Sequence, residues 1–283
     1  MSNEKLLIWK DADQKNMQTN PYPYFYQEDI LAPELCKDLI SNYPEYSFIS
    51  KGMWKNNNFR YNFSSLDVLE KKDQLPKIWY DFVIANASQN FFNSFCRIFE
   101  KEITMRYPEL GKNLNELNKL KVGIRKVDSF KTHDVLIDIQ IAGNTPVIKP
   151  TSVRGRHIDD PKKILGGLLY LRLDGDDSKG GEFEVSAPSK PDTFKFYNDV
   201  YVEDKYAKTI KIVPYQKNNF VLFLNTPLSW HGVTQRQITT FPRLFVNVIA
   251  EVEKPLFDIR SRRDNVDYLL RKLKMRKYSK YEF

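Results

Sequence analysis

Cysteine, histidine and glycine are scarce in this chain, and long apolar runs are missing. Its 283 residues include 2 cysteines, 3 histidines and 11 glycines. Two cysteines are too few for a disulfide framework, so we expect a cytoplasmic protein. Residues 1–5 lack the basic-then-apolar pattern of a signal peptide. No run of about 18 apolar residues is present, so we expect no membrane partner.

The net charge of +8 comes mostly from the C-terminal end of the chain. We expect residues 256–283 to form a basic C-terminal helix or tail. Basic excess can indicate a nucleic-acid partner, but the sequence shows no nucleic-acid-binding fold motif. We therefore expect no nucleic-acid partner, and the oligomeric state stays open.

The spacing of strand and turn signals predicts one large domain. A closed or sandwiched β core commonly occupies roughly 200–250 residues. We therefore expect residues 21–255 to form a single domain, after an N-terminal arm of residues 1–20 on the surface. Two early helices, Pro33–Ile40 and Pro76 to about Glu102, would brace one face. Strands are predicted at Tyr22–Tyr26, Lys121–Val127, Asp134–Ala142, Ile164–Leu173, Glu182–Val185, Thr209–Val213, Asn219–Leu224 and Arg243–Val252. This pattern is typical of a mainly β sandwich or barrel with flanking helices.

Two segments without clear periodicity are candidates for covering a binding site. Ser50–Ser65 is aromatic, basic and rich in asparagine, and Lys190–Ala207 is rich in aromatic residues. Loops that a rigid scaffold positions often carry binding residues. We therefore expect these segments to lie near the mouth of the core.

His157 and Asp159 are the first candidates for a metal site. In an extended segment, side chains two residues apart point to the same side of the backbone. An imidazole and a carboxylate held in this way can bind one metal ion. We expect the third ligand to be His231, which follows the apolar run Phe220–Leu224. Two histidines and one carboxylate form the facial triad of non-haem Fe(II) oxygenases.

Arg243 adds a fourth residue to this set. It opens a predicted strand in which Arg243, Phe245 and Asn247 share one face. On an edge strand, such an arginine is commonly a solvent-facing charge. Its planar fork also suits the distal carboxylate of a dicarboxylate ligand. A His-x-Asp tripeptide alone is common by chance, and the four residues together favour a functional site.

In this order and spacing, the four residues resemble the Fe(II)/2-oxoglutarate-dependent dioxygenases, in particular the prolyl-4-hydroxylase-like branch. There Asn/Asp-Pro follows the first motif, as Asp160-Pro161 does here, and a strand with Tyr-Leu comes next, as Tyr170-Leu171 does. A Gly-Gly-x-hydrophobic strand follows, as in Gly180–Val185. The resemblance covers roughly Gln140 to Val252. Asn20–Phe25 more weakly resembles the strand with which the family's domain begins.

The resemblance implies a double-stranded β-helix, or jelly roll, as the core. It implies an oxidoreductase that hydroxylates an unactivated C–H bond of a small-molecule or peptidyl substrate and releases succinate and CO2. His157, Asp159 and His231 would bind Fe(II). Arg243 would anchor the far carboxylate of the cosubstrate 2-oxoglutarate, and Tyr170, which also fits a core tyrosine, would assist it. O2 is the oxidant, and ascorbate would serve as reductant. Desaturation, cyclisation and epimerisation stay open, as does the substrate.

Two other classes of protein share parts of this pattern. A metal-binding, cupin-like protein without oxygenase activity would share the barrel but would not require Arg243. A peptide- or nucleic-acid-binding module would bind its partner through the basic tail, and the spacing of the four residues would then be a coincidence. Turnover of 2-oxoglutarate to succinate separates the oxygenase from both.

Basic residues outnumber acidic ones around the first metal motif. They are Lys149, Arg154, Arg156, Lys162 and Lys163. If two of these cations face the mouth of the core, they favour a substrate with a carboxylate, phosphate or sulfate. As solvated surface charges they would have no such role.

Overall fold

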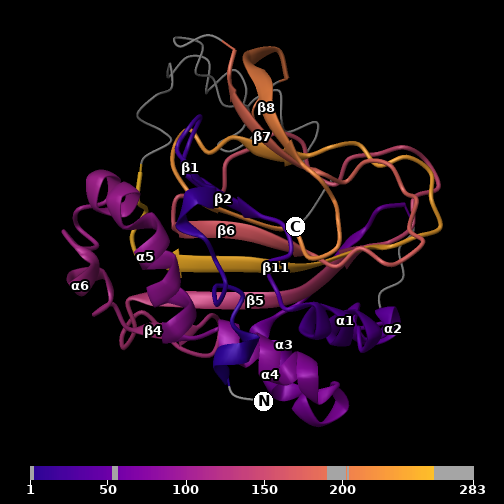
Figure 1. Cartoon of the computed structure of the whole chain (residues 1–283), viewed down its shortest axis with the longest axis horizontal. Coiled ribbons are helices and arrows are strands. Elements are labelled where there is room, and N and C mark those ends of the chain that lie inside the picture. The colour runs from indigo at the N-terminus through magenta and orange to yellow at the C-terminus, as the bar shows by residue number, and fades with distance from the viewer. Residues whose placement is uncertain (1–2, 53–56, 190–201, 203, 258–283) are drawn as a thin grey trace, which may run out of the picture.

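Two β-sheets face each other in the centre of the molecule, and helices cover the outer face of the larger sheet (Figure 1). This computed structural model describes residues 3–52, 57–189, 202 and 204–257. One apolar cluster joins the helices to the large sheet, and a second fills the space between the sheets. The domain boundaries at residues 20 and 255 stay a prediction.

The large sheet is 8-stranded, in the order β1-β2-β9-β6-β11-β5-β3, with β4 paired to β5. Its strands are β1 (Met17–Gln18), β2 (Tyr24–Gln27), β3 (Arg60–Phe63), β4 (Val122–Ile124), β5 (Val135–Asn144), β6 (Lys163–Tyr170), β9 (Phe220–Leu224) and β11 (Arg243–Val252). All pairs are antiparallel except β4 with β5. The long central strands β5 and β11 are almost entirely buried, because both of their faces are covered.

The small sheet has the order β10-β7-β8. Its strands are β7 (Phe183–Pro188), β8 (Ala207–Val213) and β10 (His231–Val233). A further bridge between His157 and His231 adds the segment at His157 to the edge of β10.

The chain crosses between the two sheets as it passes from β5 to β11. It runs from β5 to the His157 segment, back to β6, across to β7 and β8, back to β9, across to β10 and back to β11. Strands that wind between two facing antiparallel sheets in this way form a double-stranded β-helix, or jelly roll. The predicted fold class, mainly β with flanking helices around such a core, is confirmed.

Alternation along β11 decides which residues face the helices and which face the small sheet. Leu244, Val246 and Val248 belong to the helix-side core, whereas Phe245 belongs to the core between the sheets. Side chains alternate across a strand, so Arg243 and Asn247 share the inner face with Phe245. Both line the cavity between the sheets, as the sequence predicts.

The α-helices of the described residues all lie before β4 in the chain. They are α1 (Pro33–Ser41), α2 (Tyr46–Ile49), α3 (Ser65–Glu70), α4 (Lys77–Asn86), α5 (Gln89–Arg106) and α6 (Leu114–Leu117). One continuous helix from Pro76 to Glu102 was a wrong prediction, because the chain breaks at Ala87 and Ser88. The Ser88 hydroxyl accepts from the Phe91 amide at 3.4 Å and caps α5. Serine is a favoured N-cap because it satisfies an amide that the first helical turn leaves without a partner.

The N-terminal segment is part of the core, so its predicted position as a surface arm is wrong. Leu6, Ile8 and Trp9 are at most 1% exposed. Trp9 packs edge-on against Phe25 and Phe220 at centroid distances of 5.2 and 5.3 Å. This short apolar run therefore closes the outer side of the large sheet.

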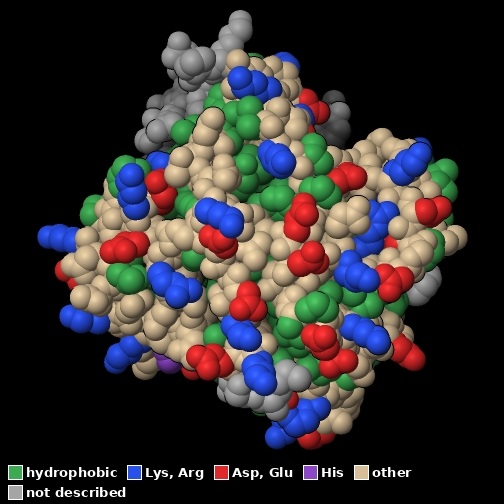
Figure 2. Space-filling view, viewed as in Figure 1, with side chains coloured by type: hydrophobic (Ala, Val, Ile, Leu, Met, Phe, Trp, Pro, Cys, Tyr) green, Lys and Arg blue, Asp and Glu red, His purple; other side chains and the backbone are tan. Residues whose placement is uncertain are grey.

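Two predicted features lie outside the described residues: the C-terminal helix after residue 257 and most of the aromatic insertion 190–207. Within the described part of the chain, no helix is long and apolar enough to cross a membrane. Figure 2 shows basic and acidic side chains interspersed over this face of the molecule.

Candidate metal centre

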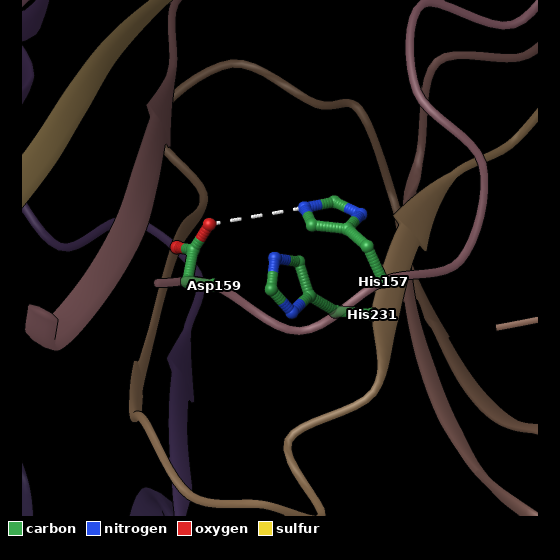
Figure 3. Close-up of side chains that lie close together, drawn as sticks. All are labelled: His157, Asp159 and His231. Atoms are coloured by element: carbon green, nitrogen blue, oxygen red, sulfur yellow. Dashed lines mark ion pairs between the residues drawn. The ribbon is translucent and has the colours of Figure 1, made fainter. Parts of the chain in front are cut away.

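His157, Asp159 and His231 converge at one buried point between the sheets (Figure 3). Each offers one ligand atom, and these atoms all lie within 4.8 Å of one another. The three residues are 4%, 7% and 6% exposed. The predicted metal residues are thus together in space, although His157 and His231 are distant in sequence.

The backbone holds the two imidazoles side by side. His157 N donates to His231 O at 2.8 Å, and His231 N donates to His157 O at 2.9 Å. Residues that exchange both backbone bonds in an antiparallel pair are direct neighbours. The ring centroids consequently lie 4.2 Å apart, with the planes tilted by 55°.

Each imidazole is oriented by a hydrogen bond from its Nδ1 atom. His157 Nδ1 contacts Gly155 O at 2.7 Å, and His231 Nδ1 contacts Ser229 O at 2.8 Å. A carbonyl only accepts, so Nδ1 carries the proton in both rings. The Nε2 atoms are then the basic ones, and His157 Nε2 lies 3.9 Å from Asp159 Oδ1. Bonds of this kind fix the orientation of metal-binding histidines.

The electrostatic setting favours the metal-binding form of all three groups. Burial, assisted by the charges of His231 and Arg154, lowers the pKa of His157 well below its ordinary value. Burial also lowers the pKa of His231, to about 4. Burial acts to raise the pKa of Asp159, but Lys163, the two histidines and Arg154 outweigh it and hold that pKa low. Near neutral pH the set is therefore two neutral imidazoles and one carboxylate.

Asp159 has room for its position because β6 carries a glycine beside it. A Cβ atom at Gly166 would lie 3.0 Å from Asp159 Oδ2 and 2.8 Å from the Phe223 ring. Lys163 Nζ contacts Asp159 Oδ1 at 3.2 Å, and an Arg154 terminal nitrogen does so at 3.5 Å. The missing side chain at Gly166 thus leaves space for the Asp159 carboxylate, and the two cations hold the carboxylate in that space.

The three residues open into a cavity of about 530 Å³ between the sheets. Arg243 lines the same cavity and is 2% exposed. Its guanidinium donates to Gly181 O at 2.7 Å, to Asn144 Oδ1 at 3.1 Å and to the Tyr170 hydroxyl at 3.0 Å. No carboxylate of the described residues forms an ion pair with it. Buried charges are usually paired, so the geometry leaves a place for an anionic ligand.

Tyr170 lies behind Arg243 and holds it. The tyrosine is fully buried, and the guanidinium carbon lies 5.0 Å from its ring centroid. Burial raises the pKa of Tyr170, although the neighbouring Arg243 opposes this. The hydroxyl therefore stays protonated near neutral pH. A direct contact of Tyr170 with a cosubstrate stays a prediction.

Of the cations near the motif, the structure places only Arg154 and Lys163 among the described residues that line the cavity. Lys149 and Lys162 are exposed. Arg156 is bound on the small sheet, where it pairs with Glu184 and Asp204, both at 2.6 Å. Two of the five cations therefore line the cavity, and Arg156 is not one of them.

Arg60 and Asn144 belong to the cavity wall but not to the predicted site residues. Arg60 on β3 and Asn144 on β5 face each other in register, and Asn144 also faces Arg243 on β11. Arg60 falls in a segment predicted to be a loop. Polar and apolar residues do alternate from Arg60 to Phe63, which is the signal that could have identified this strand.

Comparison with known proteins gives structural likenesses only. No family model and no curated protein matches the sequence. A prolyl 4-hydroxylase from Phytophthora capsici is similar at 15% identity and a TM-score of 0.47, covering 96% of this chain and 75% of that one. A prolyl hydroxylase from Trichoplax adhaerens, in complex with a hypoxia inducible factor peptide fragment, is similar at 12% identity and a TM-score of 0.43. The likeness covers 90% of this chain and 92% of that one.

A third likeness is to the dioxygenase for auxin oxidation 1 from Arabidopsis thaliana, solved with 2-oxoglutarate. It gives 10% identity and a TM-score of 0.41 and covers 89% of both chains.

Proposed function

We propose that this protein is an Fe(II)- and 2-oxoglutarate-dependent oxygenase. In this proposal it hydroxylates a C–H bond of a small-molecule or peptidyl substrate and releases succinate and CO2. The observation that carries the proposal is the convergence of His157, Asp159 and His231 in a cavity that Arg243 also lines. A cytoplasmic location stays a prediction from the cysteine content.

The donor set fits iron. Two imidazoles and one carboxylate, with further positions open, are the ligands of non-haem Fe(II) oxygenases. The Nδ1 bonds of His157 and His231 to backbone carbonyls leave both Nε2 atoms available for a metal. Bound Fe(II) would supply the chemistry that activates O2.

Arg243 fits a dicarboxylate cosubstrate. It is a buried cation without a carboxylate partner among the described residues, and its fork is held by Gly181, Asn144 and Tyr170. A guanidinium in fixed orientation suits a carboxylate, which is planar and accepts two parallel bonds. We propose that Arg243 binds the carboxylate of 2-oxoglutarate that lies away from the metal.

Aromatic rings flank the metal residues and limit water there. Phe183 stacks on His231 at a centroid distance of 5.4 Å, and Phe223 lies 4.4 Å from the same ring. Both phenylalanines are at most 3% exposed. A dry site strengthens the electrostatic interactions within it and limits side reactions.

Metal binding and cosubstrate turnover test the proposal together. The wild-type protein should bind Mn(II) or Fe(II) and convert 2-oxoglutarate to succinate with Fe(II), O2 and ascorbate. His231→Ala should abolish both, because the metal loses one of its three protein ligands. His133→Ala is the matched control: His133 lies outside the site, where it contacts Thr132, so this variant should keep both properties.

Two outcomes would contradict the proposal. Near-normal succinate formation by His231→Ala would remove that residue from the metal site. Metal binding without any succinate from the wild-type protein, with or without candidate substrates, would instead indicate a non-catalytic, cupin-like metal-binding protein.

A further inference from the structure

Positive charge dominates the wall of the cavity beyond what the cosubstrate requires. Arg60, Arg154, Lys163 and Arg243 line it, and Asp159 is the single carboxylate among the described lining residues. A divalent metal and a doubly negative 2-oxoglutarate cancel each other in charge. The excess of cations therefore persists in the loaded site, and it favours a second anion.

Arg60 is the cation least committed to other groups. Its Nε donates to Asn62 Oδ1 at 3.1 Å, and within the described residues its two terminal nitrogens have no hydrogen-bond partner. It lies over the Phe245 ring at 5.3 Å, and Arg243 lies over the same ring at 4.6 Å. Burial, and then the neighbouring Arg243 and Arg154, lower the pKa of Arg60 to about 10, which an anion beside it would reverse.

Asn144 provides a second donor between the two arginines. It is 0% exposed, and its Oδ1 accepts from Arg243. Its Nδ2 is buried without a hydrogen-bond partner, although the residue lines the cavity. Buried polar groups in native proteins nearly always have partners, so an orphaned donor at a cavity wall indicates a ligand.

We propose that Arg60 and Asn144 bind a carboxylate of the primary substrate, beside the cosubstrate at Arg243. This inference rests on the proposed function and names the substrate class. Strand register places the three residues in one row, from Arg60 on β3 through Asn144 on β5 to Arg243 on β11. The row thus has a guanidinium at each end, one for each of two carboxylates.

A carboxylate matches these donors better than a phosphate. Arg60 contributes one planar fork with a single charge, and Asn144 contributes one neutral amide NH2 group. A planar monoanion accepts from that set, whereas a phosphate monoester carries nearly two charges at neutral pH and a third acceptor oxygen. Lys163 and Arg154 are already close to the Asp159 carboxylate.

Titration of the Mn(II)- and 2-oxoglutarate-loaded protein tests this assignment without knowledge of the substrate. The probes are acetate, phenylacetate, phenylacetamide and phenyl phosphate, measured by calorimetry. The carboxylates should bind, and phenylacetamide should bind about tenfold or more weakly than phenylacetate. Arg60→Met should weaken phenylacetate binding by a similar factor, and Arg60→Lys, which keeps the charge without the fork, by less.

The matched control is Lys162→Met, which removes an exposed cation next to the metal motif. It should change phenylacetate binding by less than about twofold, because Lys162 is exposed and does not line the cavity. The affinity of each variant for 2-oxoglutarate is measured on the same sample, and for Arg60→Met it should also stay within about twofold of wild type. Retained 2-oxoglutarate binding shows that the variant is folded.

The assignment is overturned if phenylacetate and phenylacetamide bind the wild-type protein equally tightly, or if phenyl phosphate binds more tightly than phenylacetate. It is overturned too if neither acetate nor phenylacetate binds the wild-type protein. It is also overturned if Arg60→Met weakens 2-oxoglutarate as much as phenylacetate, because Arg60 would then belong to the cosubstrate site. Failure of 2-oxoglutarate itself to bind the wild type would refute the proposed function instead. Titration of the Mn(II) form with acetate would still test Arg60 in that case.

Discussion

Replacing Arg243 by methionine separates cosubstrate binding from fold stability. The change removes the charge and the fork, whose central carbon lies over the Phe245 and Tyr170 rings, but keeps an unbranched apolar side chain. In the ligand-free protein two effects oppose each other. The Gly181 carbonyl and the Tyr170 hydroxyl lose a donor, but a buried cation without a carboxylate partner among the described residues is also removed. The free energy of unfolding is therefore a poor readout, and 2-oxoglutarate affinity is the informative one.

The expected loss follows from the contacts that a carboxylate would make. Hydrogen bonds to a charged group contribute about 1.5–3 kcal/mol. This energy corresponds to about a 10- to 150-fold weaker affinity for 2-oxoglutarate. Affinity for the metal should change little, because Arg243 is not among the residues that converge on the metal position.

Calorimetric titration of 2-oxoglutarate into the Mn(II)-loaded protein measures this loss. Arg236→Met is the matched control, since Arg236 is another fully buried arginine without a carboxylate partner among the described residues. Its guanidinium instead donates to Asn58 Oδ1, Thr145 O and Phe241 O, and it is not among the cavity-lining residues. Arg236→Met should lose stability and keep 2-oxoglutarate affinity. If Arg236→Met weakens 2-oxoglutarate binding and Arg243→Met does not, Arg243 is not the anchor.

Two further predictions concern the metal residues and the N-terminal segment. Gly166→Ala should displace the Asp159 carboxylate and weaken Mn(II) binding by about 10- to 100-fold, because the alanine Cβ would lie 3.0 Å from Asp159 Oδ2. Unchanged Mn(II) affinity would show that the carboxylate adapts to the added methyl group. Asn86→Ala should lower the free energy of unfolding by about 2–4 kcal/mol in denaturant titration, since its side chain bonds Ile8 N at 2.9 Å and Leu6 O at 2.8 Å. A loss below about 0.5 kcal/mol would mean that the segment is held by apolar contacts alone.

Strong local alternation made most of the β core predictable. The strand Arg243–Val252 was predicted with the bounds that β11 has, because its two faces differ in polarity along its length. The N-terminal core segment and the break between α4 and α5 could not be predicted in this way. Leu6 to Trp9 is too short to show a period, and Ser88 interrupts a continuous apolar helical pattern by capping.

The convergence of the candidate metal residues was predictable because their geometry is partly local. Two side chains on one extended segment face the same way, and few other histidines compete for the third position. Arg60 and Asn144 depend on strand pairing that is distant in sequence. The predicted strand Asp134–Ala142 ends before Asn144, but pairing with β3 and β11 extends β5 through this residue. Tertiary contacts override local composition in such cases.

The place of Arg156 on the small sheet has the same physical cause as the common side of His157 and Asp159. Side chains alternate along an extended segment, so the residue directly before His157 points away from the metal position. Ile158, on that opposite side, is fully buried against Trp230, and Arg156 pairs with Glu184 on the small sheet. Charge reversal at Arg156 would therefore disturb this sheet, whereas Arg60, distant in sequence but in register with Asn144, is the residue to change when the substrate anion is tested.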